Sequence, residues 1–138
     1  MLLSRVAALI AVRFEEPAGD GMPLHARLSY EREDPFAVRA KFLAGHEVIA
    51  TWCFDRQMLA EGLHRPVGEG DVTFRPQWSA GGEAVRVELR DGGGCGAGAV
   101  LFVDAQALER FLDMTYAVIP AGAESVDVDA FLEELLAR

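Results

Sequence analysis

Residues 24–55 read LHARLSYEREDPFAVRAKFLAGHEVIATWCFD, and this stretch decides the fold class. Apolar and polar residues alternate in three parts of it, which is typical of strands with one buried and one solvated face. The three apolar sets are Leu24, Ala26, Leu28 and Tyr30; Phe36, Val38, Ala40 and Phe42; and Val48, Ala50, Trp52 and Phe54. Asp34-Pro35 and Ala44-Gly45 are turn signals between them. Together with residues 3–14, the pattern predicts four strands in a meander.

Three helices are expected outside these strands. Asp55 and Asp104 can each cap a helix, because a carboxylate accepts hydrogen bonds from the free N–H groups of a first turn. Gly62 is expected to end the first helix in the left-handed conformation. A third helix is expected to start near Asp127 or Asp129. The apolar residues at helical spacing are Met58, Leu59 and Leu63; Leu108, Phe111, Leu112 and Thr115; and Phe131, Leu132, Leu135 and Leu136.

The middle of the chain predicts three more strands, at residues 72–78, 84–90 and 97–103. Residues 66–71 are rich in Pro and Gly and are expected to form a turn. The resulting order is ββββα followed by βββαα, with about seven antiparallel strands packed with two to three helices in an α+β fold. A length of 138 residues suits one domain spanning residues 1–138.

Charge and hydropathy exclude several classes of function. Thirteen Lys and Arg against 22 Asp and Glu give a net charge of −9, which disfavours general binding to phosphate backbones or anionic membranes. Arg5 and Arg13 interrupt the apolar N-terminal stretch, so it does not read as a signal peptide. No run approaches the ~18 apolar residues of a membrane-spanning helix. We therefore expect a cytoplasmic protein with no direct membrane insertion.

No motif predicts catalysis, a metal or a cofactor. Residues 94–99 fit a GxGxxA dinucleotide pattern, but they lead into an apolar strand rather than a helix, so a hairpin turn is favoured. His25, His46 and His64 lie far apart in the sequence without metal-ligand spacing. Cys53 and Cys95 form no CxxC pair. The chain is predicted to be a protein-binding module rather than an enzyme, with no cofactor.

Basic residues are concentrated on the polar face of the predicted strands. Those on this face are Arg27, Arg39, Lys41, Arg75 and Arg86. A sheet with a basic outer face fits either a groove for single-stranded nucleic acid or an interface for an acidic protein. Nucleic-acid grooves add aromatic platforms, whereas Phe36, Phe42, Trp52, Phe54 and Phe74 fall on the predicted core face. Nucleic acid is therefore the weaker alternative.

Three stretches carry a family resemblance. They are DPFAV at residues 34–38, LAEGLHRPVGEGDV at residues 59–72, and VIPAGAE at residues 118–124, which follows Phe111-Leu112. The sequence resembles the SsgA-like family of sporulation and cell-division proteins of filamentous actinomycetes, and its SsgB-type members above all. The likeness spans nearly the whole chain. The residues of the second stretch also have a purely structural explanation, since Pro66 and Gly70 suit a turn.

The resemblance implies a whirly-like fold and a role at division septa. It also implies trimeric self-association and recruitment of an FtsZ-type division GTPase together with an SsgA-type adaptor. Because FtsZ-type GTPases are acidic as a class, a chain of charge −9 needs a local basic patch to bind one. The partner-binding candidates are Arg27, Arg39, Lys41, Arg65 and Arg86. The loop at residues 63–70 is a further candidate contact.

Overall fold

The computed structural model describes residues 3–15, 24–79, 82–90, 98–125 and 135–136. Within them, eight antiparallel strands form one sheet in the order β4-β3-β2-β1-β8-β7-β6-β5. The strands are β1 (Arg5–Phe14), β2 (Leu24–Glu31), β3 (Asp34–Ala44), β4 (Glu47–Asp55), β5 (Val67–Glu69), β6 (Val72–Ser79), β7 (Gly82–Leu89) and β8 (Ala99–Asp104). The helices are α1 (Arg56–Glu61) and α2 (Ala105–Val118). The α+β class with antiparallel strands is confirmed.

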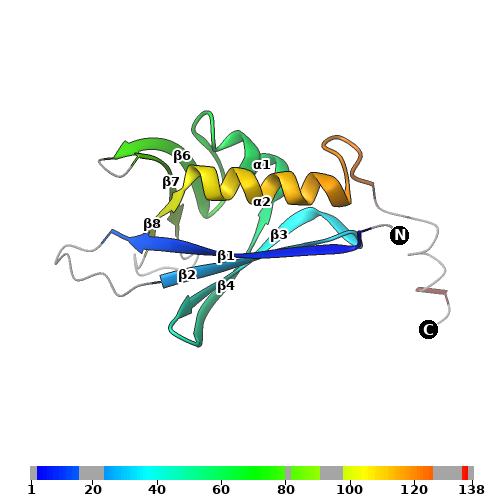
Figure 1. Cartoon of the computed structure of the whole chain (residues 1–138), viewed down its shortest axis with the longest axis horizontal. Coiled ribbons are helices and arrows are strands. Elements are labelled where there is room, and N and C mark those ends of the chain that lie inside the picture. The colour runs from blue at the N-terminus through cyan, green and yellow to red at the C-terminus, as the bar shows by residue number, and fades with distance from the viewer. Residues whose placement is uncertain (1–2, 16–23, 80–81, 91–97, 126–134, 137–138) are drawn as a thin grey trace.

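Both helices lie on the same side of the half-sheet β1–β4 (Figure 1). Helix α2 packs against β1, β7 and β8, and α1 packs against β3 and β4. The predicted apolar stripe of α2 is buried in full: Leu108, Phe111, Leu112 and Thr115. Each fully buried large apolar side chain contributes about 1.5–3 kcal/mol, so this stripe holds α2 against the sheet. The opposite face of β1–β4 carries no helix among the residues that the structure describes.

The predicted helix N-caps are confirmed. The Asp55 carboxylate accepts a hydrogen bond from the Met58 amide at 3.4 Å, and the Asp104 carboxylate accepts one from the Ala107 amide at 2.9 Å. Each aspartate ends a strand and opens a helix directly, so α1 and α2 follow β4 and β8 without a loop. This arrangement forces each helix to fold back over the sheet from which it emerges.

The strand count was predicted too low by one. Residues 67–69, expected to lie in a turn, form the short strand β5, in which Val67 pairs with Phe74 and Glu69 with Val72. Gly70, with φ +61°, makes the tight turn that follows. Backbone pairing with β6 outweighs the low strand preference of Pro and Gly there. The described order is therefore ββββα twice; most of the expected third helix lies outside the described residues, as does most of the expected hairpin at residues 94–99.

Two bulges overturn the predicted orientation of apolar side chains. Extra residues of β3 lie between its pairs with Ser29 and Glu31, which leaves Pro35 buried and Phe36 47% exposed. On β4, Ala50 pairs with Phe42 but Val48 pairs with Leu43, so Ile49 has no partner there and Val48 shares the outer face. A single inserted residue exchanges the faces of all residues beyond it. Phe36 and Val48 are therefore not core residues.

Gly62 ends α1, but the predicted left-handed conformation is wrong. Its φ is −63°, which any residue adopts. A Cβ on Gly62 would lie 2.4 Å from the Cβ of Phe74, which is fully buried. The position requires glycine because α1 approaches β6 so closely, and not because of its backbone angles.

We expect Gly62→Ala to lower the free energy of unfolding by about 1–3 kcal/mol, because the added methyl group overlaps backbone-proximal atoms that cannot rotate away. Chemical denaturation measures this. Gly70→Ala is the control, since it places a methyl group in open space and adds only the strain of φ +61°. A stabilised Gly62→Ala variant, the usual result of a Gly→Ala change at an unstrained position, would contradict the packing argument.

Candidate functional site

Three of the five predicted partner-binding residues lie together on the uncovered side of the sheet. Arg27 on β2 pairs in register with Lys41 on β3, and Arg39 lies opposite Ser29 one step further along. All three side chains are exposed, and none forms an ion pair with any residue that the structure describes. We call Arg27, Arg39 and Lys41 the basic face.

Apolar side chains border the basic face. Leu9 on β1 lies opposite Arg27 and is 63% exposed, and Val48 at the far side is 49% exposed. Solvent-exposed apolar groups next to unpaired cations are typical of a protein-binding surface, because burial and charge can then act together. The surface is thus suited to a partner that is acidic and partly apolar.

Arg86 and Arg65 lie elsewhere. Arg86 is on β7, separated from β2 by β1 and β8, and its guanidinium is already 3.2 Å from the Glu88 carboxylate and 3.9 Å from that of Glu15. Hydrogen bonds from Arg90 and Arg86 hold the pKa of Glu88 below its ordinary value. Arg65 follows α1 and pairs with Glu61 at 3.1 Å. The structure therefore does not join either residue to the basic face.

A second outward row crosses the other half of the sheet. Arg13 on β1 lies opposite Phe102 on β8, which lies opposite Arg86; Arg86 in turn faces Arg75 on β6. The Arg13 guanidinium lies 5.7 Å from the centre of the Phe102 ring, a cation–π distance. Phe102 lies on the outer face of the sheet. The sequence did not indicate this, because Phe102 stands within an apolar run, Val100 to Val103. This row brings charge and an aromatic ring together on the outer face of the described sheet.

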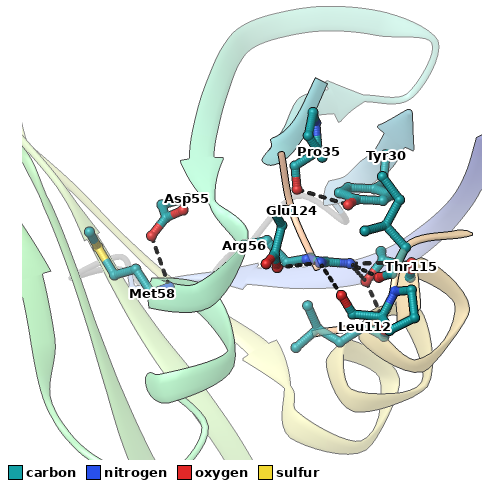
Figure 2. A network of polar contacts seen from close by, with 10 residues as sticks. Tyr30, Pro35, Asp55, Arg56, Met58, Leu112, Thr115 and Glu124 are labelled. Atoms are coloured by element: carbon teal, nitrogen blue, oxygen red, sulfur yellow. Dashed lines mark hydrogen bonds and ion pairs between the residues drawn. The ribbon is translucent and has the colours of Figure 1, made fainter. Parts of the chain in front are cut away.

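On the helix side, Arg56 is the centre of a buried network that the sequence did not reveal (Figure 2). Its side chain is only 1% exposed. The guanidinium donates to the carbonyl oxygens of Thr115 at 3.3 Å, Ile119 at 2.7 Å and Pro120 at 3.4 Å, and it forms an ion pair with Glu124. These bonds tie the start of α1 to the end of α2 and to the loop beyond it.

Two tyrosine rings enclose the Arg56 guanidinium. It lies 4.7 Å from the centre of the Tyr30 ring and 5.0 Å from that of Tyr116. Burial raises the pKa of both tyrosines above the ordinary value, so both rings stay neutral at physiological pH. The Tyr30 hydroxyl donates to the Pro35 carbonyl at 2.8 Å, which joins the β3 bulge to the same network. In the sequence, an arginine directly after a helix N-cap is expected to be solvated. The burial of Arg56 follows only from its tertiary contacts.

A cavity of about 520 Å³ opens beside Arg56, and two of the three family stretches, residues 59–72 and residues 118–124, contribute to its lining. Gln57, Glu61 and His64 come from α1 and the loop after it, whereas Tyr116 and Glu124 come from α2 and the segment that follows. Residues far apart in the sequence are thus brought to one place by the Arg56 bonds. The cavity is open to solvent and mixed in polarity.

The described residues contain no group of three or more His, Cys, Asp or Glu side chains arranged to hold a metal ion. No helix within the described ranges is long and apolar enough to cross a bilayer. The chain is a small α+β protein with a curled antiparallel sheet. The two described helices lie on one side of β1–β4, and the other side presents cationic side chains that have no ion pair among the described residues. The comparisons then give its family.

A family model described as "Streptomyces sporulation and cell division protein, SsgA" matches residues 24–124. The chain belongs to the SsgA family. It is 40% identical over 135 residues to the sporulation-specific cell division protein SsgB of Streptomyces coelicolor, covering 96% of each chain. It is 35% identical to the SsgB of Frankia casuarinae, covering 95% of this chain and 91% of that one.

Solved structures agree with the fold. A crystal structure of the SsgA-like sporulation-specific cell division protein of Thermobifida fusca superposes with a TM-score of 0.84 at 33% identity, covering 98% of this chain and 99% of that one. A structure of Streptomyces coelicolor SsgB superposes with a TM-score of 0.79 at 38% identity, covering 89% and 94%. The resemblance seen in the sequence is confirmed.

The Arg56–Glu124 pair makes a pH-dependent contribution that can be measured. The hydrogen bond from Arg56 lowers the pKa of Glu124, so the pair stabilises the fold fully above the ordinary glutamate pKa of about 4.3 and loses this stabilisation as the pH falls through the lower folded-state pKa. We expect Glu124→Gln to cost about 1–3 kcal/mol of unfolding free energy at pH 7. The cost should shrink steadily below about pH 4.

Chemical denaturation between pH 7 and pH 3 gives this difference directly. The matched control is Glu109→Gln, an exposed glutamate on α2 with no recorded ion pair among the described residues. Its effect should be near zero at all pH values. Equal, pH-independent costs for both variants would show that the Arg56–Glu124 pair contributes nothing.

Proposed function

We propose that this chain is a non-enzymatic cell-division regulator that marks septum sites during sporulation and recruits or positions the FtsZ-type division GTPase there, alone or through an SsgA-type adaptor. The relatives are named sporulation-specific cell division proteins, which supports a role in sporulation septation. The observation that supports direct recruitment is the basic face, where three unpaired cations stand together on a protein of charge −9.

The charge distribution explains why the basic face is the favoured docking surface. An acidic partner is repelled by most of this protein, and the repulsion is offset only where positive charge is free. Arg86 and Arg65 already have carboxylate partners, so Arg27, Arg39 and Lys41 retain the most attraction for an incoming carboxylate. Their position on paired strands fixes the spacing of their backbones, so that binding orders the side chains but no loop.

We expect Arg39→Glu to weaken co-sedimentation with filaments of the FtsZ-type GTPase, or with the adaptor, by at least about tenfold, because a like charge at an interface costs more than 1.4 kcal/mol. The melting temperature should stay the same, since Arg39 is exposed and unpaired within the described chain. The control is Arg75→Glu, which reverses an exposed strand arginine on β6. If Arg39→Glu folds normally and binds like the wild type, the basic face is not the docking surface.

Arg65→Glu is a separate arm of this experiment, because Arg65 follows α1 on the helix side. A loss with Arg65→Glu and none with Arg39→Glu would move the docking surface to the loop at residues 63–70 and the cavity beside Arg56. Loss of septal localisation for the same variant in sporulating cells would support the same assignment.

Single-stranded nucleic-acid binding is the second candidate, and the row Arg13, Phe102, Arg86 and Arg75 is the observation that favours it. Its weakness is that one ring gives one stacking platform and that Glu88 and Glu15 neutralise Arg86. We expect binding weaker than about 10 μM at ~150 mM salt, with a steep salt dependence. Phe102→Ala should abolish what remains. A labelled oligonucleotide titration that returned submicromolar affinity would make nucleic acid the leading function.

A further inference from the structure

The two edges of the sheet differ in how well they resist pairing with a further strand. Strand β5 is three residues long and directly follows Pro66, and short edge strands with proline resist pairing. Strand β4 is nine residues long and pairs only with β3 among the residues that the structure describes. Residues 48–54 of β4, VIATWCF, contain neither a charge nor a proline. The β4 edge therefore presents a row of backbone N–H and C=O groups to which another strand can bind.

A cavity of about 560 Å³ lies on the core side of β4. Its β4 lining consists of Ile49, Ala50 and Trp52, with Phe42 of β3 and Leu101 of β8 among the residues around them. Ile49 is 48% exposed and Trp52 is half-buried, so both apolar side chains retain surface for a further contact. Because successive side chains of a strand point to opposite sides, every second side chain of a strand added to β4 would point toward this cavity. Apolar side chains suit it.

The other side of the same edge leads to the basic face. Beyond the bulge, β4 pairs regularly with β3, and here Cys53 lies opposite Arg39 and Thr51 opposite Lys41. Cys53 and Thr51 are small and exposed, so they leave room for the longer side chains of β3. Because neighbouring strands lie about 4.8 Å apart, a strand added to β4 has its backbone about 10 Å from β3. An Arg or Lys side chain and a carboxylate side chain together span this distance.

We infer that the β4 edge binds an extended segment of a partner protein in which acidic residues alternate with apolar ones. The backbone of the segment pairs with β4, its apolar side chains enter the cavity beside Trp52, and its carboxylates meet Arg39 and Lys41. In this mode of recognition, main-chain hydrogen bonds give affinity and the alternating side chains give specificity. The β4 strand of a second copy does not have this composition, since its residues 48–54 carry no acid.

This docking mode rests on the proposed function in one respect, that a partner uses the basic face. It adds the conformation of the bound segment and the backbone edge that holds it. A segment lying flat across the basic face would instead contact Leu9 on β1, which is separated from β4 by β2 and β3. The two modes therefore differ in whether they need Ile49 or Leu9.

A synthetic peptide that alternates Glu and Val over about eight residues, a typical strand length, is the probe. Trp78 is the second tryptophan of the chain and is 78% exposed, so a Trp78→Phe background leaves Trp52 as the reporter of binding by fluorescence. Titration at ~150 mM salt should give saturable binding with a dissociation constant below about 100 μM. The same peptide with Lys in place of Glu should bind at least about tenfold more weakly, because it meets like charges.

N-methylation of the probe separates backbone pairing from side-chain attraction. On a strand paired along one edge, the N–H groups of every second residue point toward the neighbouring strand and the others point away. Two further peptides carry methyl groups on all the Val nitrogens or on all the Glu nitrogens. One of them should lose binding, and the other should stay within about threefold of the probe.

Ile49→Glu should weaken binding of the probe at least about tenfold with an unchanged melting temperature, because it places an exposed carboxylate in the path of an acidic strand. The matched control is Leu9→Glu, the same charge change at an exposed apolar residue of β1. It should change the affinity by less than about twofold, because salt screens a charge three strands away.

No saturable binding of the probe, equal effects of the two methylations, or a Leu9→Glu effect as large as that of Ile49→Glu would each overturn the inference. An affinity that falls as the protein concentration rises would also overturn it, because a second copy would then occupy the edge. No arm changes Arg39 or uses the division GTPase. The probe can therefore fail while the filament test of the proposed function succeeds, and the reverse.

Discussion

The burial of Arg56 is the constraint on which the arrangement of the two halves depends. A guanidinium that is 1% exposed must find acceptors for its donors, and it takes them from the last turn of α2, from the following loop and from Glu124. Removing a charge from water costs several kcal/mol, which the ion pair and the two tyrosine rings offset. Because the carbonyl acceptors and Glu124 come from the second half of the chain, the arginine at the start of α1 holds the two ββββα units together.

Two of the three family stretches, residues 59–72 and residues 118–124, meet in a cavity beside Arg56. The first includes the end of α1 and the loop after it, and the second includes the end of α2 and Glu124. Neither stretch has an evident local reason for its composition beyond turn chemistry. In the fold both stretches contribute residues to the lining of one cavity. Gly62 adds a second close contact in the same region, against Phe74 of β6.

Both described helices lie on one side of β1–β4, and the other side carries no helix among the residues that the structure describes. Antiparallel sheets accept this arrangement because their strands alternate apolar and polar residues. On this side, β2 and β3 present Arg27, Arg39 and Lys41, and none of them forms an ion pair with a residue that the structure describes. An acidic protein thus exposes a local cluster of cations on this side of the sheet.

The sequence by itself determined the strands other than β5, the helix caps, and the face of the strands that carries Arg27, Arg39 and Lys41. These features follow from short-range periodicity and from side chains that bond to the neighbouring backbone. It also identified the family from three short stretches. It did not determine β5, the bulges that expose Phe36 and Val48, the reason for Gly62, or the burial of Arg56, since each depends on pairing or packing between residues distant in the chain. The separation of Arg65 and Arg86 from the basic face was likewise decided by the tertiary structure, because the order of strands and the side on which a helix packs are set by the whole core and not by any local pattern.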